Sequence, residues 1–502
     1  MAQTPTWAEN IAPILYANCT KCHHNGGLGP SSFLDYLDVV AQKSSIRYNV
    51  EQKIMPPWPG DPSYRHYADE RILKATEIDA IINWVNNGTP EGDVSKAPKK
   101  PTYTSDSKIG AYDLKITIPT YQSSAKSGDI YRCFSIPTNL PANKFISAVE
   151  IIPGNSEIVH HVLVYQDTTL NTDNLDKADP LPGYTNFGGT GSANSILVAP
   201  YVPGSDPIIF PSGTGVKLFK NARIILQIHY PAGSDGQFDS TLCLIRFTSQ
   251  PTVREVFIAP LLHHGSISNG PFAIAKDQIK TFYQSATIPV DVSLLSVMPH
   301  MHLIGKSTKV FSKPPTGDTI PLIQIKDWDF HWQGQYRFQY LQKISSGSKI
   351  QSIVTYDNTL NNPNNPNNPT KPITLGEATS SEMMLTFFYF MTYKTGDEKI
   401  LQDSSLISAG IFSSKAIKFA INQNPAHDQI NLGMPAEEAT LQIVDEQGKQ
   451  VLSKSYDQQD TRIEKRLELM FINVSELASG GYFLIVSTKK EGKVFYSKFI
   501  KL

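Results

Sequence analysis

Short apolar runs separated by Pro, Gly and Asn recur through most of the chain, and such runs predict β-strands. Clear examples are residues 130–137, 223–230, 240–247 and 297–305. A different pattern stands near the N-terminus, where apolar residues recur at the spacing of a helix that is capped by Thr76 and ends at Gly88. These apolar residues are Ile78, Ile81, Ile82 and Val85. The chain is therefore expected to be mainly β, with a small all-α part first.

The length of 502 residues exceeds what one hydrophobic core usually holds, so several domains are expected. Residues 94–104 are charged and contain proline, which favours an extended linker between folded units. The pattern of the chain predicts a multidomain protein with units at residues 1–95, 105–250, 251–400 and 413–502.

Charge and composition argue against several classes of partner. The formal net charge is -1 and there is no long basic run, so neither nucleic acid nor an anionic membrane surface is an expected partner. No apolar run approaches the roughly 20 residues that cross a bilayer, so no membrane span is predicted. The start Met1-Ala2-Gln3 lacks the charged and apolar segment of a signal peptide, and it indicates a mature end with an added initiator Met.

The motif CTKCH carries the attachment signature of c-type haem. Cys19 and Cys22 would form thioethers to the porphyrin, and His23 would become an axial ligand. A chance match and a redox dithiol are the alternatives. Met55, in the proline-rich run IMPPWPGDP, offers the second axial ligand of a His/Met cytochrome. Residues 1–95 thus resemble a small all-α cytochrome c domain with haem c as its cofactor.

Histidines recur beside the predicted strands. His300 and His302 are two apart on one of them, so both rings point to the same face and can reach one metal ion. Two histidines at this spacing, taken alone, usually bind no metal, so the case for a metal site depends on other candidate ligands. These are His160, His161, His229 and Met383. Five imidazoles and one thioether form a nitrogen-rich, soft set of ligands that suits copper and suits magnesium or calcium badly.

His160 and His161 pose a geometric problem, because neighbours on a regular strand face opposite ways. If both bind one ion, the strand must be twisted or end there. We expect one ring to bind through Nδ1 and the other through Nε2. Gln227 shares a strand face with His229, and a role in a cleft and a role in the core are equally compatible with that position.

The order HH, QxHY, HxH and then EM before an aromatic strand resembles the copper type II monooxygenases, the family of peptidylglycine alpha-hydroxylating monooxygenase and dopamine beta-monooxygenase. The resemblance covers residues 105–400 and implies two jelly-roll-like β-sandwich copper domains, 105–250 and 251–400. It implies two copper ions as cofactors. The electron-transfer copper would be held by His160, His161 and His229, and the catalytic copper that binds dioxygen by His300, His302 and Met383. Met384 is then expected in the core.

Three positions depart from the peptide-processing members of this family. Met298 stands where they place an arginine that binds the substrate carboxylate, and Leu385 and Phe387 replace an asparagine and a tyrosine. The resemblance therefore implies a copper-dependent monooxygenase that hydroxylates a C–H bond of a small, non-peptide organic substrate. Its other partners would be dioxygen and an electron donor, either ascorbate-like or a redox protein, with electrons supplied through the haem domain.

Cys133 and Cys243 lie on two predicted strands of residues 105–250. They are either buried free thiols or, in an exported protein, a disulfide, and a strand-to-strand disulfide is also what the family resemblance implies.

The last part of the chain is a compact β pattern with Gly480-Gly481-Tyr482 before a terminal hairpin. Residues 413–502 resemble the C-terminal sorting domain of the type IX secretion system, an immunoglobulin-like β-sandwich. This implies a protein that is secreted or held at the cell surface after passing through the periplasm, with the secretion machinery as a partner. An accessory immunoglobulin-like domain with a binding role is the alternative.

Two other functions compete with hydroxylation. The chain could be a secreted haem and copper electron-transfer or copper-binding protein without hydroxylase activity, and dioxygen uptake coupled to product would separate the two. A secreted adhesin with incidental histidines fails to account for six ligands in family order.

Overall fold

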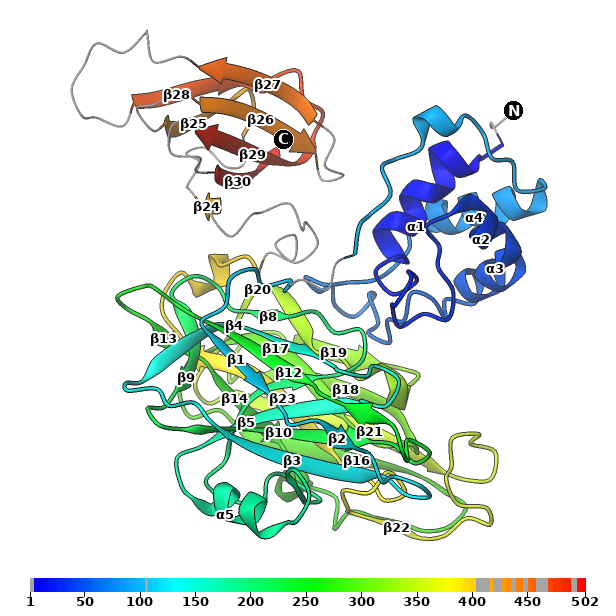
Figure 1. Ribbon diagram of the computed structural model, residues 1–502, viewed down its shortest axis with the longest axis vertical. Coiled ribbons are helices and arrows are strands. Elements are labelled where there is room, and N and C mark those ends of the chain that lie inside the picture. Colours follow the sequence, from blue (N-terminus) through cyan, green and yellow to red (C-terminus); the bar gives the residue numbers. More distant parts are fainter. Residues whose placement is uncertain are drawn as a thin grey trace. The chain divides into compact units, whose positions relative to one another are not determined.

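The computed structural model describes residues 4–103, 107–402, 416–418, 426–434, 439–445, 450–456, 468–488 and 494–502. The chain divides into two compact units, residues 1–407 and 408–502. It is mainly β, as predicted, with a few short helices near the N-terminus (Figure 1). Among the described residues, no helix combines the length and the apolar character needed to cross a membrane.

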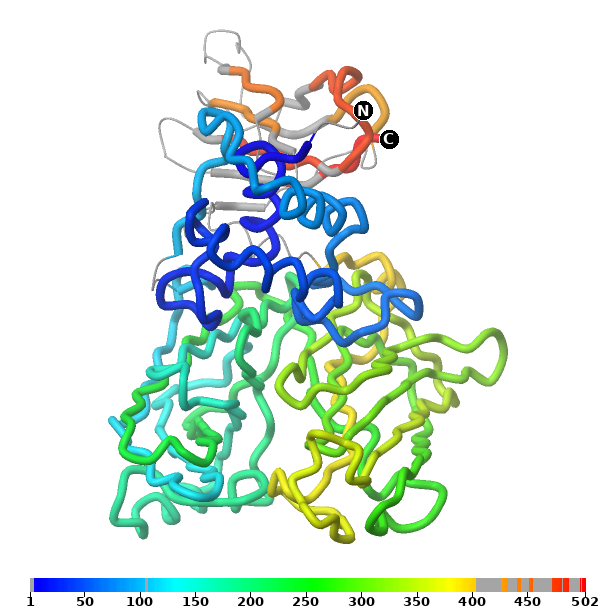
Figure 2. Tube along the Cα trace, turned by 90° about the vertical axis from the view of Figure 1, so that its right-hand side faces the viewer, coloured from blue at the N-terminus to red at the C-terminus, as the bar shows by residue number. Residues whose placement is uncertain are grey.

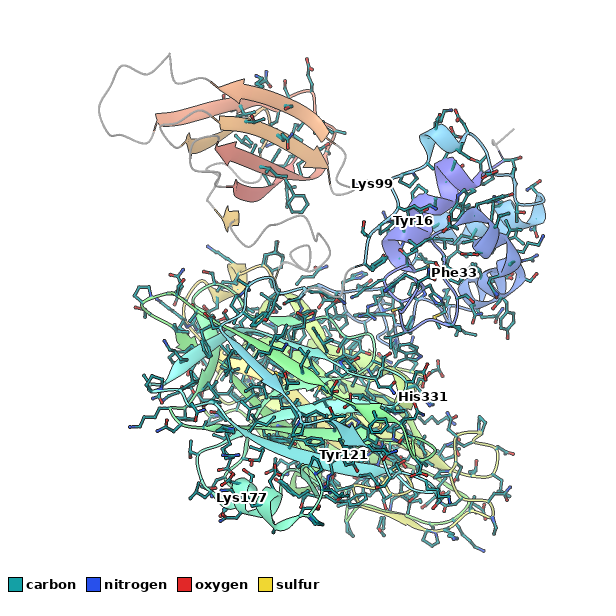
Figure 3. The ribbon with its side chains drawn as sticks, viewed as in Figure 1. Tyr16, Phe33, Lys99, Tyr121, Lys177 and His331 are labelled. Carbon is teal, nitrogen blue, oxygen red and sulfur yellow. The ribbon has the colours of Figure 1, made fainter. Side chains whose placement is uncertain are left out.

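The N-terminal helices pack around a small aromatic core that includes Trp7, Phe33 and Trp84, and Tyr16 and Phe33 lie among these helices in Figure 3. The predicted helix near residue 80 is present, but Thr76 is not its cap. The backbone N–H of Lys74 instead donates to the Glu77 carboxylate at 2.7 Å. The helical elements are η1 (Trp7–Ile11), α1 (Ala12–Asn18), α2 (Tyr36–Ala41), α3 (Lys43–Glu51), α4 (Ala75–Asn86) and η2 (Val94–Lys96).

Residues 57–71, here called the strap, leave this helical core. Tyr67 is buried in the core of the sheets formed by residues 257–392, and its hydroxyl donates to the Leu322 carbonyl at 2.8 Å. The Asp69 carboxylate makes two hydrogen bonds of 2.5 Å with the Arg337 guanidinium. Part of the predicted haem domain therefore contributes to a core outside its own helices. The predicted domain limits stay predictions.

Residues 114–255 form two main sheets that enclose a large apolar core. The strands are β1 (Leu114–Thr117), β2 (Tyr121–Gln122), β3 (Ile130–Pro137), β4 (Lys144–Ile152), β5 (His161–Asp167), β6 (Tyr184–Thr185), β7 (Ile196–Tyr201), β8 (Ile208–Ile209), β9 (Thr214–Leu218), β10 (Arg223–Tyr230), β11 (Phe238–Asp239), β12 (Leu242–Phe247) and β13 (Arg254–Glu255), with helix α5 (Asn171–Ala178). One sheet has the order β1-β12-β4-β9-β13, with β8 beside β4, and the other has the order β6-β3-β10-β5-β7.

Residues 257–392 form the second pair of sheets, which lies beside the first in Figure 2. The strands are β14 (Phe257–Leu262), β15 (Ala273–Ile274), β16 (Gln278–Thr287), β17 (Val292–His300), β18 (Gly305–Lys313), β19 (Ile320–Ile325), β20 (Tyr336–Ile344), β21 (Lys349–Asn358), β22 (Ile373–Thr374) and β23 (Leu385–Thr392), with turns η3 (His264–Ser266), η4 (Phe330–Trp332) and η5 (Asp397–Lys399). Their orders are β14-β23-β17-β20 and β16-β21-β18-β19. The ends of β5, β10 and β17 supply the candidate ligands.

The predicted disulfide between Cys133 and Cys243 is wrong, because both cysteines are free. Strand alternation explains why. Cys243 on β12 points into the core between the two sheets, as does Phe134 on β3. Cys133 is the neighbour of Phe134 and points to the opposite face, where it packs on Tyr184. Burial raises the pKa of both thiols to about 12, so they stay protonated.

The C-terminal unit has its own small apolar core, which includes Leu441, Leu484 and Phe499. Its strands are β24 (Ala416–Lys418), β25 (Gln429–Met434), β26 (Ala439–Asp445), β27 (Gln450–Tyr456), β28 (Glu468–Asn473), β29 (Gly480–Thr488) and β30 (Val494–Lys501). They form a sheet of order β24-β30-β29-β26-β27 and the pair β25-β28. The predicted start at residue 413 lies outside the described residues.

Candidate metal centres

Three histidines converge at one end of the sheet that contains β5 and β10. His161 is the first residue of β5 and pairs with His229 on β10. His160 precedes the strand, and its backbone N–H donates to the His229 carbonyl at 3.0 Å. The three Nδ1 atoms lie 3.2 to 3.3 Å from one another. The strand begins between the two neighbouring histidines, so the alternation that would separate their rings does not apply.

All three rings present Nδ1 to the common point, so the expectation of one Nδ1 and one Nε2 ligand is wrong. A point equidistant from three atoms at this spacing lies about 1.9 Å from each, close to the ~2.0 Å of a metal–imidazole bond. Burial lowers the pKa of His160 to about 4 and the pKa of His161 well below its usual value. Neutral imidazoles are the form that binds metal, so this cluster fits a copper ion.

Asp129 lies next to the cluster, and no sequence pattern pointed to it because it is 100 positions away from His229. Its carboxylate lies 3.3 Å from Nε2 of His229. The adjacent His229 ring lowers the pKa of Asp129 to about 2. The same carboxylate accepts a hydrogen bond from Thr379 at 2.9 Å. A carboxylate on the far nitrogen of a ligand histidine fixes the ring and raises its basicity.

His300 ends β17 and His302 follows two residues later, with ring centroids 5.2 Å apart. Nδ1 of His300 lies 2.5 Å from Oε1 of Gln333, and Nδ1 of His302 lies 3.1 Å from the Ser381 carbonyl. Both partners are acceptors, so each Nδ1 carries the proton and each Nε2 lone pair is left for a metal. Burial lowers the pKa of His300 to about 4 and that of His302 to about 3.

The buried carboxylate of Glu382 joins the two segments of this second group. It accepts the backbone N–H of His302 at 2.8 Å, of Ile304 at 2.9 Å and of Met383 at 3.2 Å. Burial raises the pKa of Glu382 to about 8. Met384, on the other face, is buried in the apolar core as expected.

Both groups face one cavity of about 260 Å³. The ring of Phe330 is stacked on His160 with centroids 5.3 Å apart, and it meets His302 edge-on at 6.0 Å. The sequence did not single out Phe330. The side chains that line the cavity include His160, His161, His300, His302, Met383, Leu163, Leu197, Pro200, Tyr201, Gln227, Met298, Glu377, Leu385 and Phe387. Its lining is thus largely apolar outside the candidate ligands.

Gln227 is a cavity residue, which settles the two roles that the sequence left open. Its side-chain amide donates to the carbonyl oxygens of Asn186 at 3.2 Å and of Gly189. His331 has aromatic neighbours in the sequence, but its side chain is 69% exposed and pairs with Asp329 at 3.1 Å. His264 accepts the backbone N–H of Met384 at 3.1 Å, which is a structural role.

The haem-attachment motif forms a tight turn after α1. The backbone N–H groups of Cys22 and His23 donate to the Cys19 carbonyl at 3.1 and 3.0 Å, and both thiols are free. Nδ1 of His23 lies 3.1 Å from the Ser31 carbonyl, so Nε2 is left for an iron ligand. A Cβ atom at Gly29 would collide with the His23 ring. These features fit a covalently attached haem. Met55 is partly buried just before the strap, and its axial role stays a prediction.

Comparison with known proteins gives two results for the sequence. Residues 423–501 match the family described as secretion system C-terminal sorting domain. The chain is 24% identical over 284 residues to DBH-like monooxygenase protein 1 of Mus musculus, covering 52% of this chain and 44% of that protein. The chain thus spans less than half the length of this curated relative.

Two solved structures are similar only at low scores. PNGase F, a glycosylasparaginase from Flavobacterium meningosepticum, has a TM-score of 0.23 and 8% identity over 56% of this chain and 97% of its own. The infectious bursal disease virus VP2 subviral particle has a TM-score of 0.17 and 9% identity over 60% of this chain and 77% of its own. Scores this low carry no argument about fold or activity.

The sorting-domain match confirms the prediction for the C-terminal region, and the protein is secreted or located at the cell surface. The similarity to the mouse protein supports the resemblance to a monooxygenase family.

Proposed function

We propose that the protein is a copper-dependent monooxygenase that hydroxylates a C–H bond of a small, non-peptide organic substrate with dioxygen. The observation that carries this proposal is the convergence of two histidine groups on one cavity, one through three Nδ1 atoms and the other with both Nε2 atoms free. The similarity to a DBH-like monooxygenase supports the same reaction class.

The two groups of ligands would have different roles. His160, His161 and His229 form a rigid trigonal set that suits an ion cycling between Cu(II) and Cu(I). His300, His302 and Met383 add a thioether, which favours Cu(I). When bound, copper supplies the electron transfer and the activation of dioxygen. Asp129 orients His229, Gln333 orients His300, and Glu382 holds the segments of His302 and Met383 together.

The cavity lining argues for the class of substrate. Met298, Leu385 and Phe387 line the cavity at the positions where peptide-processing relatives bind their substrate. None of these three side chains can pair with a carboxylate, so a peptide with a free C-terminal glycine has no partner there. Their apolar surface favours a small hydrophobic molecule, because binding displaces water from the apolar surfaces of the cavity and of the molecule.

We infer that haem c is the second cofactor, which Cys19 and Cys22 would attach and which His23 and Met55 would hold. Its role would be to pass electrons from an external donor, either an ascorbate-like reductant or a redox protein, to the copper sites. The C-terminal sorting domain would interact with the secretion machinery.

The test is mass spectrometry of small-molecule mixtures incubated with copper-loaded protein, a reductant and isotopically labelled dioxygen. The proposal expects one labelled oxygen atom in a product, and no labelled product from His300→Ala. Copper binding with electron exchange but no labelled product from any mixture would contradict hydroxylation and support an electron-transfer or copper-binding protein.

A further inference from the structure

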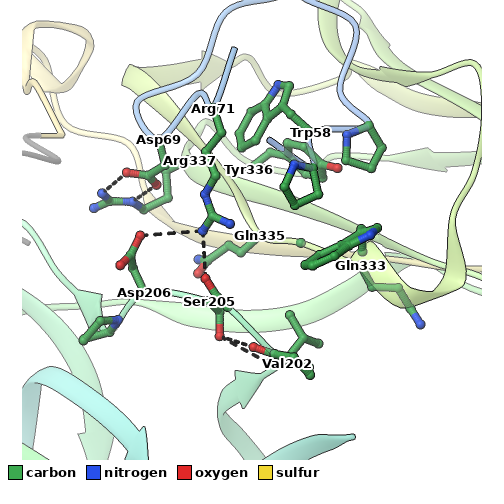
Figure 4. Close-up of a pocket in the computed structure, with 17 residues that line it drawn as sticks. Trp58, Asp69, Arg71, Val202, Ser205, Asp206, Gln333, Gln335, Tyr336 and Arg337 are labelled. Carbon is green, nitrogen blue, oxygen red and sulfur yellow. Dashed lines mark hydrogen bonds and ion pairs between the residues drawn. The ribbon is translucent and has the colours of Figure 1, made fainter. Parts of the chain in front are cut away.

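The haem-attachment turn contacts the loop of residues 202–207. This loop follows β7 and belongs to the sheets of residues 114–255. Lys21, the residue between the two cysteines of CTKCH, pairs with the Asp206 carboxylate. Arg71 donates to the Gly204 carbonyl at 2.9 Å. It also lies 3.7 Å from the Asp206 carboxylate, and a dashed line marks this ion pair in Figure 4. Burial alone would raise the pKa of Asp206, but Lys21 and Arg71 outweigh it and the pKa is lowered. Asp206 therefore stays charged between two cations.

The residue just before this loop reaches the metal cavity. Tyr201 ends β7, pairs with Val162 on β5 beside His161, and lines the cavity with His160 and His161. Its neighbours Val202 and Pro203, which begin the loop that pairs with Lys21, line the same cavity. Tyr201 thus joins this loop to the cavity of the three-histidine group.

Two ion pairs join the strap to the sheets of residues 257–392. Asp61 pairs with Lys326 at 2.7 Å, and Asp69 pairs with Arg337. Asp206 therefore pairs with two segments of the N-terminal part, with the attachment turn through Lys21 and with the strap through Arg71. A fixed contact of this kind keeps donor and acceptor groups in one geometry instead of relying on chance encounters through a flexible linker.

We propose that Lys21, Arg71 and Asp206 form an internal electron-transfer dock that holds the haem-attachment turn against the loop after Tyr201, and that Tyr201 is the side chain through which this turn communicates with the three-histidine copper site. This inference rests on the proposed function. Each transfer moves one electron from ferrous haem to the cupric three-histidine site and leaves ferric haem and Cu(I). Two transfers serve one hydroxylation, and an external one-electron donor of the ascorbate or redox-protein class reduces the haem again.

The test follows the haem spectrum of the full chain, loaded with haem and Cu(II), without dioxygen or substrate. A light pulse reduces the haem through a photosensitiser, and the loss of the ferrous absorption band gives the rate of transfer to copper. Asp206→Asn is expected to slow this rate about tenfold or more, since the docked fraction falls with the lost pairing. Asp206→Glu, which keeps the charge, is expected to retain most of the rate.

Two further variants separate the dock from a general loss of structure. Lys326→Met breaks the Asp61 pair at another point of the same contact and is expected to leave the rate unchanged. Tyr201→Leu is expected to slow the transfer, whereas Tyr201→Phe, which keeps the ring, is expected to retain it. Copper and haem content are measured for each variant, and Lys21→Met replaces Asp206→Asn if the latter does not fold.

The outcomes distinguish this inference from the proposed function. An unchanged rate in both the Asp206 or Lys21 variant and Tyr201→Leu, at full copper and haem content, would overturn the dock. If the unsubstituted protein with both metals shows no haem reoxidation at all, the proposed role of haem as the electron supply is what fails.

Discussion

The partner of one ring nitrogen of a candidate histidine ligand decides which nitrogen remains for a metal. At His300 and His302 an acceptor on Nδ1 leaves Nε2 free, whereas at the three-histidine group all Nδ1 atoms face inward and Asp129 backs His229. A neutral ring with a fixed tautomer binds a metal without first losing a proton. Single substitutions at these positions should therefore separate the two sites.

Met383→Ala removes the one soft ligand of the second group. We expect copper content to fall from two ions to about one and hydroxylation to be lost, because the three-histidine group does not involve Met383. Copper analysis and product formation measure the two effects. Met384→Leu is the control, since Met384 is buried in the core and a volume-conserving change there should retain activity. Full activity of copper-loaded Met383→Ala would show that the ligand assignment is wrong.

Asp129→Asn removes the carboxylate that lies 3.3 Å from His229 Nε2. We expect the affinity of the three-histidine site for copper to fall by about 10- to 100-fold, the usual effect of losing such a partner. Competition with a chelator of known affinity measures it. Asp61→Asn, whose carboxylate pairs with Lys326, should leave the affinity unchanged. If Asp129→Asn bound copper with the same affinity as the unsubstituted protein, Asp129 would have only a structural role.

At the scale of elements, the turn η4 lies between the two histidine groups and closes the cavity. It supplies Phe330, whose ring contacts His160 and His302, and it is followed by Gln333, which binds His300. A single turn thus contacts both candidate copper sites, so its packing should decide how well the cavity excludes water.

Phe330→Ala should admit water to the space between the sites. We expect dioxygen uptake per molecule of product to rise by about twofold or more, because a reaction that is less well shielded from solvent leaks into side reactions. An oxygen electrode and product analysis give the ratio. Phe238→Ala, at an exposed phenylalanine outside the lining of the cavity, serves as the control. An unchanged ratio in Phe330→Ala would mean that the ring does not seal the cavity.

At the scale of the whole molecule, the chain has two compact units, and the N-terminal helical part belongs to the larger one. The strap is the reason, because Tyr67 is part of the apolar core of the second sandwich. The N-terminal helical part and the sheets of residues 257–392 should therefore depend on each other for stability, whereas residues 408–502 should not be needed for either.

Tyr67→Ala should destabilise the sheets of residues 257–392, although Tyr67 lies within the predicted haem domain. We expect a loss of about 3 kcal/mol in the free energy of unfolding, as for other large aromatic side chains removed from a core. Denaturant unfolding followed by aromatic fluorescence measures it. Tyr64→Ala, in the same strap but only partly buried, should have a clearly smaller effect. Equal effects would indicate that the strap does not contribute to that core.

A chain that ends at residue 407 should keep copper, haem and turnover but should not be exported, because the sorting domain matches residues 423–501 and the candidate ligands all lie before residue 384. Metal analysis and product formation test the purified protein, and surface labelling tests export. Loss of turnover in the purified truncated protein would assign the C-terminal unit a role in catalysis or substrate binding.

The sequence by itself determined the features that depend on neighbouring residues. The CTKCH turn and the two-residue spacing of His300 and His302 follow from local geometry or from short motifs. The choice of Met383 over Met384 as a ligand rests on the family resemblance and stays a prediction. The mainly β character follows from the alternation of apolar and polar positions. The sorting domain was also visible, because its signal lies within one continuous segment.

The tertiary structure alone decided the features that join distant segments. Asp129 reaches His229, and Phe330 reaches both histidine groups, only because sheet register and loop packing bring them together. The disulfide failed for the same reason, since a one-residue difference in strand position turns Cys133 away from the core that holds Cys243. The strap belongs to the predicted haem domain but packs outside it. Tyr67 is buried against residues more than 200 positions later in the chain, and no local pattern encodes such a contact.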